Sequence, residues 1–445
     1  MKDTISAIAT AIGVASISII RVSGPKAKEI ASKVAPKATL RPREAILTPF
    51  FDKNQEMIDQ GIILYFKAPN SFTGEDIVEF HSHGGVAIAQ EILESTLAAG
   101  ARLAKAGEFS KRAFLNGKID LTKAEAIAKI IEAKSSDALK ILARQLKGEL
   151  KEFVDKARDD LLQAIAYSEV MIDYAEEDIP SDILEKLEIK LLNLKRDLEN
   201  ILDSSLRRKG LIEGFKLAII GKPNVGKSSL LNSLLNYERA IVSEIAGTTR
   251  DTIEESIRIK SHIVRVVDTA GIRDSKDQIE KIGIKRSLNS VKEADIIVAL
   301  FDSSREFDEE DQKIVDLLEK NKDKIQIILL NKIDLKMKFD IKKIEKFSPI
   351  KISKDNIKPF LDKLEKVLES FSVEEELILS SNRQIEAVKE TIKSINEAFE
   401  PLKKEELEFF SYHLQEAVSK ISQITTPYQN EEILDKMFSE FCLGK

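Results

Sequence analysis

The chain has 445 residues, of which 43% are hydrophobic and 32% carry a charged side chain. This balance is typical of globular proteins and excludes disordered and collagen-like chains, and the length favours about three domains over a single core. With 69 basic and 75 acidic residues, the formal net charge is -6. No general basic field is therefore available for a nucleic acid, so any contact with RNA must come from local patches or from a partner.

A single cysteine, Cys442, excludes an internal disulfide and fits the reducing conditions of the cytoplasm. Residues 5–20 are mostly small and apolar, but this run is shorter than the roughly 20 residues that a membrane-spanning helix needs. Lys2 is offset by Asp3, so the positively charged segment that starts a signal peptide is missing. We therefore expect two strands in this region, and a cytoplasmic protein without a membrane segment.

The N-terminal third mixes short strand-like runs with helices. Strands are predicted over residues 4–10, 17–23, 61–66 and 76–81, and a helix over residues 86–98. From residue 121 to about residue 205 the pattern becomes helical. Apolar side chains there repeat at three- and four-residue steps and are predicted to share one helix face: Leu139, Leu142, Leu146, Leu150 and Phe153.

The middle of the chain alternates strands and helices, as a parallel α/β sheet does. The apolar runs that predict buried strands are residues 216–220, 263–267, 295–301 and 325–330. After residue 372 heptad-like stripes return, which usually reflect core packing: Ile385, Val388, Ile392, Ile395, Phe399 and Leu402, then Leu414, Val418, Ile421 and Ile424. The simplest arrangement is an α/β domain inserted into one helical domain, with the polar residues 203–214 as its attachment.

A phosphate-binding loop follows the first of these buried strands. Residues 221–228 match the pattern G-x-x-x-x-G-K-S and precede a predicted helix at residues 227–236. The glycines allow backbone N–H groups to close around phosphates, Lys227 then reaches the β- and γ-phosphate oxygens, and the Ser228 hydroxyl ligates Mg²⁺. The other residues of this loop and helix that we expect at the nucleotide are Asn224, Val225, Gly226 and Ser229.

Two elements for the γ-phosphate and its metal come next, in the order that a GTPase requires. Thr249, in the segment G-T-T-R-D, is a candidate second Mg²⁺ ligand. Asp268 follows an apolar strand and should lie in the outer shell of the metal, while the Gly271 N–H can sense the γ-phosphate. Ras-like enzymes place a glutamine after this glycine to orient water, but this chain has Ile272. Another group must therefore position the water.

Base selection is predicted to depend on an N-K-x-D element that follows the last buried strand. Its Asp334 carboxylate can accept hydrogen bonds from both N1–H and N2–H of guanine, a pair of donors that adenine lacks. This difference selects GTP over ATP. The other residues expected near the base are Asn331 and Lys332 of the same element, and Ser353 and Lys354 further along the chain. Lys354 departs from the small residue usual at its position.

Segments outside these motifs resemble one family over essentially the whole chain. They are residues 3–5, 20–24, 70–76, 83–85, 107–118, 120–125 and the terminal F-C-L-G-K at 441–445. On these segments, and on the order of its nucleotide-binding motifs, the chain resembles the MnmE family, also called TrmE, of tRNA uridine-modification GTPases. The motifs near the two ends make the resemblance specific, because other GTPases with similar nucleotide-binding motifs lack them.

The resemblance implies a multidomain α/β protein in which a P-loop GTPase α/β domain is inserted into an all-helical domain. An α+β N-terminal domain for folate binding and dimerisation precedes them. The expected limits are residues 1–118 for that N-terminal domain, 119–210 for the first helical part, 211–372 for the Ras-like G domain, and 373–445 for the second helical part with its C-L-G-K motif.

The resemblance also implies a reaction and partners. The family is a homodimer that works with the flavoprotein MnmG (GidA), which would carry FAD. Together they install an aminomethyl or carboxymethylaminomethyl group on C5 of the wobble uridine of tRNA, which is expected to be held largely by the partner. The one-carbon ligand would be 5,10-methylenetetrahydrofolate or 5-formyltetrahydrofolate. The positions that match folate-binding residues are Arg21, Glu79, Lys118 and Lys445.

By the same resemblance, a K⁺ ion beside the phosphates does the work of an arginine finger when the G domains dimerise. The matching positions are Asn224, Ser243, Ile245 and Thr248, and Ser243 and Thr248 are also expected at the nucleotide. Glu280 matches the family's catalytic acid, although from the residues alone it would be a solvated helix charge. Cys442 matches a cysteine that is essential for the modification step, although a lone cysteine is most often a small buried hydrophobe.

One segment departs from the family pattern. Residues 11–16 hold one glycine and no charge where the family usually has a Pro/Gly-rich turn with an arginine, so we expect a reshaped loop near the folate site. His81 and His83 have no third ligand nearby and are expected to serve a turn rather than a metal. Two alternatives stay open: a ribosome-assembly or RNA-binding GTPase switch without modification chemistry, and a family member that has lost folate binding.

Overall fold

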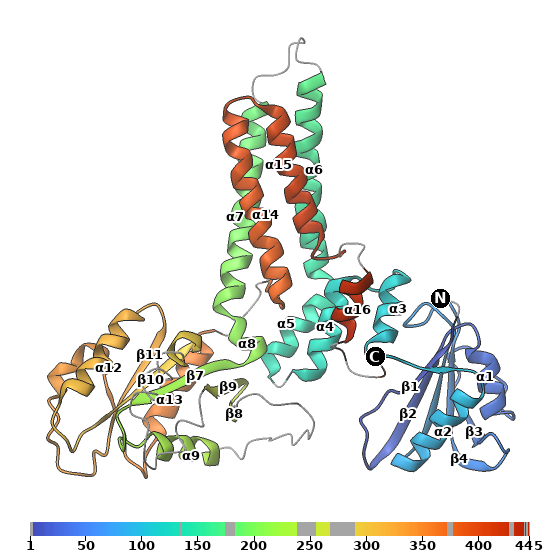
Figure 1. Ribbon diagram of the computed structural model, residues 1–445, viewed down its shortest axis with the longest axis horizontal. Helices are drawn as coiled ribbons and strands as arrows, with labels where there is room; N and C mark the ends of the chain where they lie inside the picture. Colours follow the sequence, from blue (N-terminus) through green and yellow to red (C-terminus); the bar gives the residue numbers. More distant parts are fainter. Residues whose placement is uncertain are drawn as a thin grey trace. The chain divides into compact units, whose positions relative to one another are not determined.

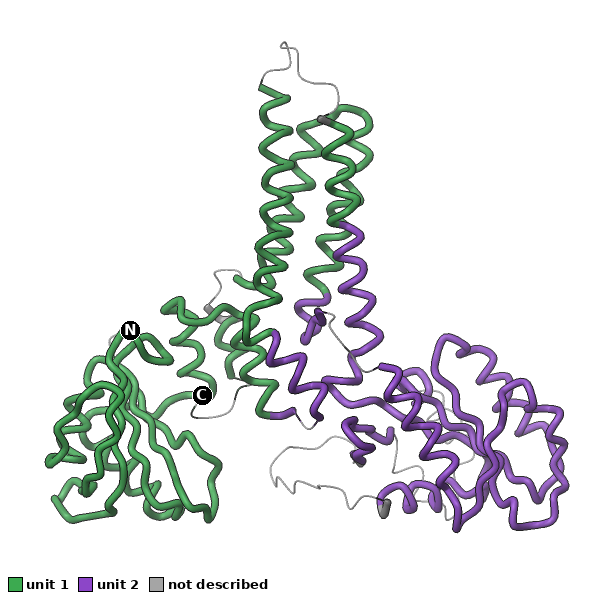
Figure 2. Tube along the Cα trace, turned by 180° about the vertical axis from the view of Figure 1, so that it is seen from behind, with its two compact units in different colours: residues 1–131, 145–194, 386–445 green, residues 132–144, 195–385 purple. Residues whose placement is uncertain are grey.

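The computed structural model describes residues 3–133, 135–173, 183–237, 255–267, 290–371, 377–426, 431–439, 441 and 444. The chain forms two compact units, which are coloured separately in Figure 2. The first unit consists of residues 1–131, 145–194 and 386–445, and the second of residues 132–144 and 195–385. Each unit is therefore built from segments that lie far apart in the sequence.

A mixed sheet forms the N-terminal part of the first unit. Its strands are β1 (Ile5–Ile8), β2 (Ala15–Ser23), β3 (Ile46–Phe51), β4 (Met57–Phe66), β5 (Ile77–Gly84) and β6 (Arg102–Leu103). The strand order is β3-β4-β5-β2-β1-β6, and neighbours pair antiparallel except β1 with β6. Helices α1 (Ala27–Val34) and α2 (Val86–Ala98) share one apolar core with this sheet, in which Ile30, Phe80 and Ile92 are fully buried.

The predicted elements of this region are confirmed. Strands β1, β2, β4 and β5 correspond to the four predicted strands, and α2 has the predicted limits. Strand β3, strand β6, helix α1 and helix α3 (Glu108–Leu115) are additional elements. Strands β3 and β6 form the two edges of a sheet in which β2 lies directly beside β5.

The rest of the first unit is helical. It contains α4 (Leu121–Glu132), α6 (Glu149–Asp173), α15 (Leu407–Ser422) and α16 (Glu431–Ser439), while α5 (Ser136–Lys147), α7 (Ile183–Arg207) and α14 (Asn382–Lys403) pass from one unit to the other. Helices α6 and α15 pack along each other, as Figure 1 shows. Val388, Ile395 and Leu402 of the predicted stripe on α14 are buried, which confirms that this stripe is core packing.

The predicted single stripe from Leu139 to Phe153 is wrong. Helix α5 ends at Lys147, and Gly148 takes a φ of 101°, in the left-handed region that favours glycine. Helix α6 then begins at Glu149, so the five apolar residues belong to two helices. Leu139 is 42% exposed. The three- and four-residue spacing runs across a helix break that the spacing itself does not reveal.

The second unit contains a sheet with helices on both faces. Its strands are β7 (Phe215–Gly221), β8 (Glu255–Ile259), β9 (His262–Val267), β10 (Ile296–Asp302), β11 (Ile325–Asn331) and β12 (Ile350–Lys351). The order is β12-β11-β10-β7-β9-β8, and neighbours pair parallel except β8 with β9. The four predicted buried strands are β7, β9, β10 and β11.

Alternation along the central strand β10 divides the apolar side chains between two cores. Val298 and Leu300 belong to the core that contains side chains of α9 (Lys227–Tyr237) and α13 (Lys358–Glu369). Ala299 and Phe301 belong to the other, with side chains of α12 (Glu309–Lys320) and of the 3-10 turns Ile341–Lys343 and Glu345–Phe347. Because successive side chains of a strand point to opposite faces, both faces of the sheet are covered.

The segment predicted as a polar attachment, residues 203–214, is helical. It comprises the end of α7 and the short helix α8 (Lys209–Glu213). Leu211 is 3% exposed, and a Cβ atom at Gly210 would collide with the Phe215 ring. The chain therefore enters β7 through a packed helical corner rather than through an exposed loop. The domain limits predicted from the sequence stay a proposal.

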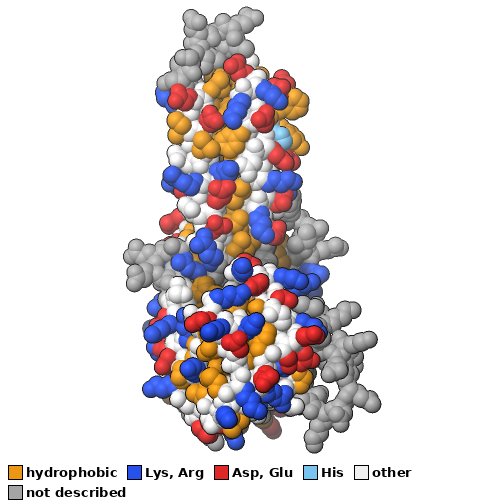
Figure 3. Space-filling model, turned by 90° about the vertical axis from the view of Figure 1, so that its left-hand side faces the viewer, with side chains coloured by type: hydrophobic (Ala, Val, Ile, Leu, Met, Phe, Trp, Pro, Cys, Tyr) orange, Lys and Arg blue, Asp and Glu red, His pale blue; other side chains and the backbone are white. Residues whose placement is uncertain are grey.

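The surface carries charges of both signs. On the face drawn in Figure 3, basic and acidic side chains of the described residues are interspersed, as the near balance of 69 basic and 75 acidic residues leads one to expect. None of the described helices is both long enough and apolar enough to cross a membrane.

A buried histidine links the β8–β9 hairpin to α5 within the second unit. His262 is 2% exposed and packs edge-on against Phe215. Its Nδ1 lies 3.6 Å from Asp137 Oδ2, and neither ring nitrogen has a hydrogen-bond partner among the described residues. Burial lowers the pKa of His262, because a charged ring is poorly solvated there, and Asp137 and Glu369 oppose this shift.

This histidine predicts an acid-sensitive second unit. The unfolded chain takes up a proton on His262 near pH 6.5, whereas the folded chain does so only at lower pH. The stabilisation is therefore complete above pH 6.5 and is lost as the pH falls below it. We expect the fall in unfolding midpoint between about pH 7.5 and about pH 5.5 to be smaller in His262→Gln than in the wild type. The control is His83→Gln, which replaces an exposed histidine. An equal fall in the unfolding midpoint of His262→Gln and the wild type would contradict this role of His262.

Candidate functional site

The phosphate-binding loop joins β7 to α9. Gly226 takes a φ of 109°, and a Cβ atom there would collide with the side-chain amide of Asn331. Only glycine therefore fits both the backbone conformation and the available space. Lys227 is the first residue of α9, and its Nζ donates hydrogen bonds of 2.8 Å to the carbonyl oxygens of Gly221 and Lys222. The ammonium group thus points back into the loop.

Lys227 is placed where an anion would stabilise it. Burial lowers the pKa of Lys227, and no carboxylate of the described residues contributes to the shift. A buried ammonium whose hydrogen-bond acceptors are neutral carbonyls gains from a nearby phosphate, which supplies the missing negative charge. Ser228, half-buried in the first turn of α9, and the exposed Ser229 follow directly. The loop therefore has the geometry expected for the β- and γ-phosphates.

A second lysine holds the start of the loop in place. Lys222 is 7% exposed, and its Nζ lies 2.8 Å from Asp308 Oδ2 and 2.7 Å from Asp311 Oδ2 at the N-terminus of α12. Burial alone would lower the pKa of Lys222, but the hydrogen bonds to the two aspartates raise it. Sequence reasoning missed this anchor. A lysine at a variable position of the motif was the only signal available.

The base-binding element is tied to the same loop. Asn331 Nδ2 donates to the carbonyl oxygen of Val225 at 2.9 Å, and Lys332 Nζ donates to that of Asn224 at 2.9 Å. Lys332 Nζ also donates to Asp302 Oδ2 at 2.6 Å. Burial would raise the pKa of Asp302, but the hydrogen bonds from Lys332 and Ser304 hold it below its usual value. Two residues of the N-K-x-D element therefore act as struts to the loop.

The remaining base contacts lie beside this element. Asp334 is exposed, and Ile333 N–H donates to the carbonyl oxygen of Ile352 at 3.3 Å, which brings residue 353 close to the element. Ser353 forms a pair of backbone hydrogen bonds with Asn356, of 3.3 Å and 3.2 Å, and Lys354 is exposed. The structure thus gathers residues from β7, β11 and the loop after β12 at the carboxyl ends of the parallel strands, where ligands of such sheets bind.

Nine predicted site residues lie outside the described part of the chain. They are Ser243, Ile245, Thr248, Thr249, Asp268, Gly271, Glu280, Cys442 and Lys445.

A cavity lies in the first unit, over strands β2 and β5. Its volume is about 340 Å³, and it is lined by Arg21, Phe66, Phe72, Ile77, Glu79 and Ile127. Arg21 and Glu79 are opposite each other in the antiparallel register, and Arg21 Nε lies 2.8 Å from Glu79 Oε1. Two of the four predicted folate residues therefore form one ion pair in the wall of a partly apolar cavity.

The ion pair is extended by aromatic and histidine side chains. The Arg21 guanidinium lies 6.0 Å from the ring centre of Phe72 and 5.7 Å from that of Phe109. Burial would raise the pKa of Glu79, but the hydrogen bond from His81 at 3.2 Å and the charge of Arg21 lower it. The carboxylate is thus held in its charged form, as an acceptor for ligand N–H groups.

The two histidines lie within β5 and not in a turn, which corrects the prediction. His81 contacts Glu79, whereas His83 Nδ1 lies 2.9 Å from Asp59 Oδ1. The two histidines are two residues apart along β5, so each lies beside a different carboxylate. The exposed side chains of Ile12 and Val14, in the segment that departs from the family pattern, are not among the residues that line the cavity.

Gly444, near the C-terminus of the same chain, contacts the Arg21 side chain of this cavity. Arg21 Nη1 donates to the carbonyl oxygen of Gly444 at 3.5 Å. Gly444 has a φ of 89°, and a Cβ atom there would collide with the carbonyl oxygen of Ile8, so the position requires glycine. Lys118, in contrast, is exposed and does not line the cavity, although its side-chain stem lies against Gly74.

Comparison with known proteins identifies the family of the chain. The family described as the MnmE helical domain matches residues 121–442, and the one described as the GTP-binding protein TrmE N-terminus matches residues 4–118. A protein of Sulfurovum sp. named tRNA modification GTPase MnmE is 62% identical over 446 residues, covering 100% of this chain and 99% of its own length. Proteins of the same name from Aliarcobacter butzleri and Sulfurimonas denitrificans are 58% and 56% identical, again over 100% of this chain and over 99% and 100% of their own lengths.

These matches extend over the N-terminal sheet, the helices and the nucleotide-binding segment between them. The two family matches together leave out only residues at the ends of the chain and between residues 118 and 121. The chain therefore belongs to the MnmE, or TrmE, family of tRNA modification GTPases.

Proposed function

We propose that this chain is a K⁺-activated GTPase that modifies tRNA in the cytoplasm together with a flavoprotein partner. The pair would install an aminomethyl or carboxymethylaminomethyl group on C5 of the wobble uridine, using a one-carbon unit from tetrahydrofolate. The observation that carries the proposal is the cavity lined by the Arg21–Glu79 pair, whose Arg21 also contacts Gly444 near the C-terminus. A GTPase switch without modification chemistry has no use for such a cavity in its N-terminal sheet.

The nucleotide-binding half of the proposal uses the second unit. Lys227 would bind the phosphates, Asp334 the guanine base, and Ser228 with Thr249 the Mg²⁺ ion, with Asp268 in its outer shell. Potassium would bind beside the phosphates at Asn224, and the other proposed positions are Ser243, Ile245 and Thr248. The strut from Lys332 to the Asn224 carbonyl supports this, because it fixes the backbone of the one described residue of that site. Glu280 would act on the attacking water in place of the missing glutamine.

Potassium dependence is the direct test of this half. With no glutamine after Gly271, hydrolysis by the full-length protein should be slow in NaCl and should rise at least tenfold in KCl of equal ionic strength. Steady-state phosphate release in the two salts measures this, and RbCl, whose ion is close to K⁺ in size, should restore part of the rate. Asn224→Ala should remove most of the difference between the salts. Equal rates of the wild type in NaCl and KCl would exclude the potassium mechanism.

The folate-binding half uses the first unit. Arg21 would bind a carboxylate of the ligand and Glu79 the pterin N–H donors, because both side chains line the cavity and Glu79 is held in its charged form. Lys118 and Lys445 would contribute further cations, and Cys442, two residues before Gly444, would take part in the modification step. The protein would act as a homodimer, with FAD and most of the tRNA contacts on the flavoprotein MnmG (GidA).

Removing Arg21 should separate the two halves. A charge-assisted hydrogen bond contributes about 1.5–3 kcal/mol, so Arg21→Ala should weaken the binding of 5-formyltetrahydrofolate about tenfold or more. GTP hydrolysis should persist, because Arg21 lies in the other unit. Isothermal titration of the full-length protein measures the affinity, with the exposed Arg41→Ala as a matched control. If the wild type binds no folate, the chain is better explained as a family member that has lost folate binding.

A further inference from the structure

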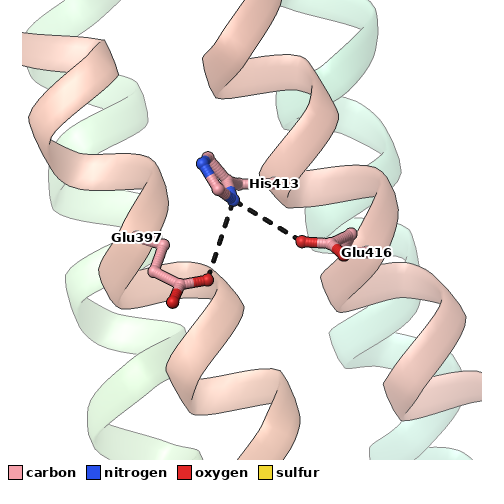
Figure 4. A group of neighbouring side chains, drawn as sticks. All are labelled: Glu397, His413 and Glu416. Carbon is pink, nitrogen blue, oxygen red and sulfur yellow. Dashed lines mark ion pairs between the residues drawn. The ribbon is translucent and has the colours of Figure 1, made fainter.

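Three metal-ligating side chains that belong to neither site described above meet on the helical hairpin of α14 and α15. Glu397 lies on α14, and His413 and Glu416 lie on α15, all within the first unit. Their ligand atoms lie within 4.8 Å of one another, and Figure 4 shows the His413 ring directed towards both carboxylates. The proposed function uses none of these residues.

The distances within this cluster are too long for hydrogen bonds. His413 Nδ1 lies 3.8 Å from Glu397 Oε2 and 3.6 Å from Glu416 Oε2, whereas N–H donors usually approach oxygen to about 2.7–3.2 Å. Nδ1 is also buried from solvent and has no hydrogen-bond partner among the described residues. A buried polar atom without a partner is costly, so this nitrogen calls for a partner that lies between it and the carboxylates.

A metal ion fits this gap. Zinc binds imidazole nitrogen at about 2.0–2.1 Å and carboxylate oxygen at about 2.0–2.2 Å, so two ligands of a tetrahedral ion lie roughly 3.3–3.5 Å apart. The two nitrogen–oxygen separations exceed this by only a few tenths of an ångström, and the two carboxylate oxygens lie within 4.8 Å of each other, so side-chain rotations would bring the three ligands to one ion. One imidazole with two carboxylates also suits a first-row transition metal better than Mg²⁺ or Ca²⁺, which prefer oxygen ligands.

The surroundings orient the ligands. His413 and Glu416 are three residues apart on one helix, so they share a face. The Tyr412 hydroxyl donates to Glu416 Oε1 at 3.4 Å, which leaves Oε2 towards His413. The three side chains are 23% (His413), 44% (Glu397) and 40% (Glu416) exposed, so an ion here would keep room for water ligands. In three-ligand metal sites, neighbouring side chains typically orient the ligands by hydrogen bonds, and the ion keeps an open position for water.

We propose that Glu397, His413 and Glu416 bind one divalent transition-metal ion of the Zn²⁺ type, which connects α14 to α15 and keeps its remaining coordination positions for water. The ion would hold together two helices that the three residues between them already place side by side.

Isothermal titration of the metal-free, nucleotide-free full-length protein with Zn²⁺, in excess Mg²⁺, tests the site. We expect one saturable site for the wild type, and at least tenfold weaker binding for His413→Asn and for Glu397→Gln. Titration with Co²⁺ should give a visible absorption band of a low-coordinate nitrogen and oxygen site, which both variants lose. Unfolding midpoints measured without metal show whether the variants are folded. Glu416→Gln, a third variant, tests the remaining proposed ligand.

Two controls separate this cluster from other zinc ligands of the chain. His83→Asn removes an exposed histidine that has a carboxylate partner, and Cys442→Ser removes the only thiol. Both should leave Zn²⁺ affinity within about twofold of the wild type. Undiminished binding in His413→Asn, loss of binding in Cys442→Ser, or no saturable binding by the wild type would each overturn the proposal. In the last case, the cluster is an ion pair between a protonated histidine and two glutamates.

Discussion

Replacing Lys227 by alanine is expected to reduce kcat/KM for GTP hydrolysis by at least about a hundredfold, as losses of single preorganised groups at developing charge do. The ammonium group of Lys227 is partly buried and donates to the carbonyl oxygens of Gly221 and Lys222. Burial lowers its pKa, so the bound phosphates gain an ammonium that water solvates poorly and that pairs strongly with them. Charge on the phosphate oxygens grows towards the transition state. The fold-loss in kcat/KM should therefore exceed the fold-loss in GTP affinity.

Phosphate release under single-turnover conditions, together with binding of a fluorescent GTP analogue, measures the two losses separately. Lys313→Ala is the matched control, because Lys313 is an exposed lysine of α12 in the same unit. The circular dichroism spectrum should be unchanged in both variants. If Lys227→Ala keeps hydrolysis within about threefold of the wild type, the loop at residues 221–228 does not hold the reacting phosphate.

Asp334→Asn is expected to weaken GTP binding by about a hundredfold, roughly 3 kcal/mol, and to favour xanthosine triphosphate. The carboxylate accepts from N1–H and N2–H of guanine, whereas the amide of asparagine keeps one acceptor for N1–H and turns the other into a donor that meets the N2 amino group unfavourably. Xanthine carries a carbonyl oxygen in place of the N2 amino group, and it restores the match. The struts from Asn331 and Lys332 to the phosphate-binding loop are unchanged by this substitution, so the phosphate half of the site should stay intact.

Competition between the two nucleotides in an equilibrium binding assay checks this prediction. The exposed Asp323→Asn, in the loop after α12 of the same unit, serves as control and should not alter either affinity. Hydrolysis of xanthosine triphosphate by Asp334→Asn should approach the rate of the wild type with GTP. Unchanged GTP affinity in Asp334→Asn would refute the assignment of the base site.

The parts of the molecule that local sequence determines were predicted closely. The phosphate-binding loop is one contiguous motif between a strand and a helix, and it forms at the predicted place. Helix α2 has its predicted limits because Gly84, Gly85 and Gly100 interrupt the helical pattern on either side. Strand β3 escaped prediction because Pro49 lies within it. Proline removes a ladder donor and is tolerated here because β3 is the edge strand, a fact that only the sheet order reveals.

What only the tertiary structure decided are the contacts between residues distant in sequence. The Arg21–Glu79 pair depends on the register of β2 against β5, and the approach of Gly444 to Arg21 spans almost the whole chain. The tie from Asn331 to Val225 depends on β11 and β7 ending at the same edge of a sheet. In the same way, His413 and Glu416 are neighbours by helical spacing, but Glu397 joins them only because α14 and α15 pack antiparallel. Local patterns fix which residues form a helix, a strand or a phosphate loop, whereas packing decides which of their side chains meet.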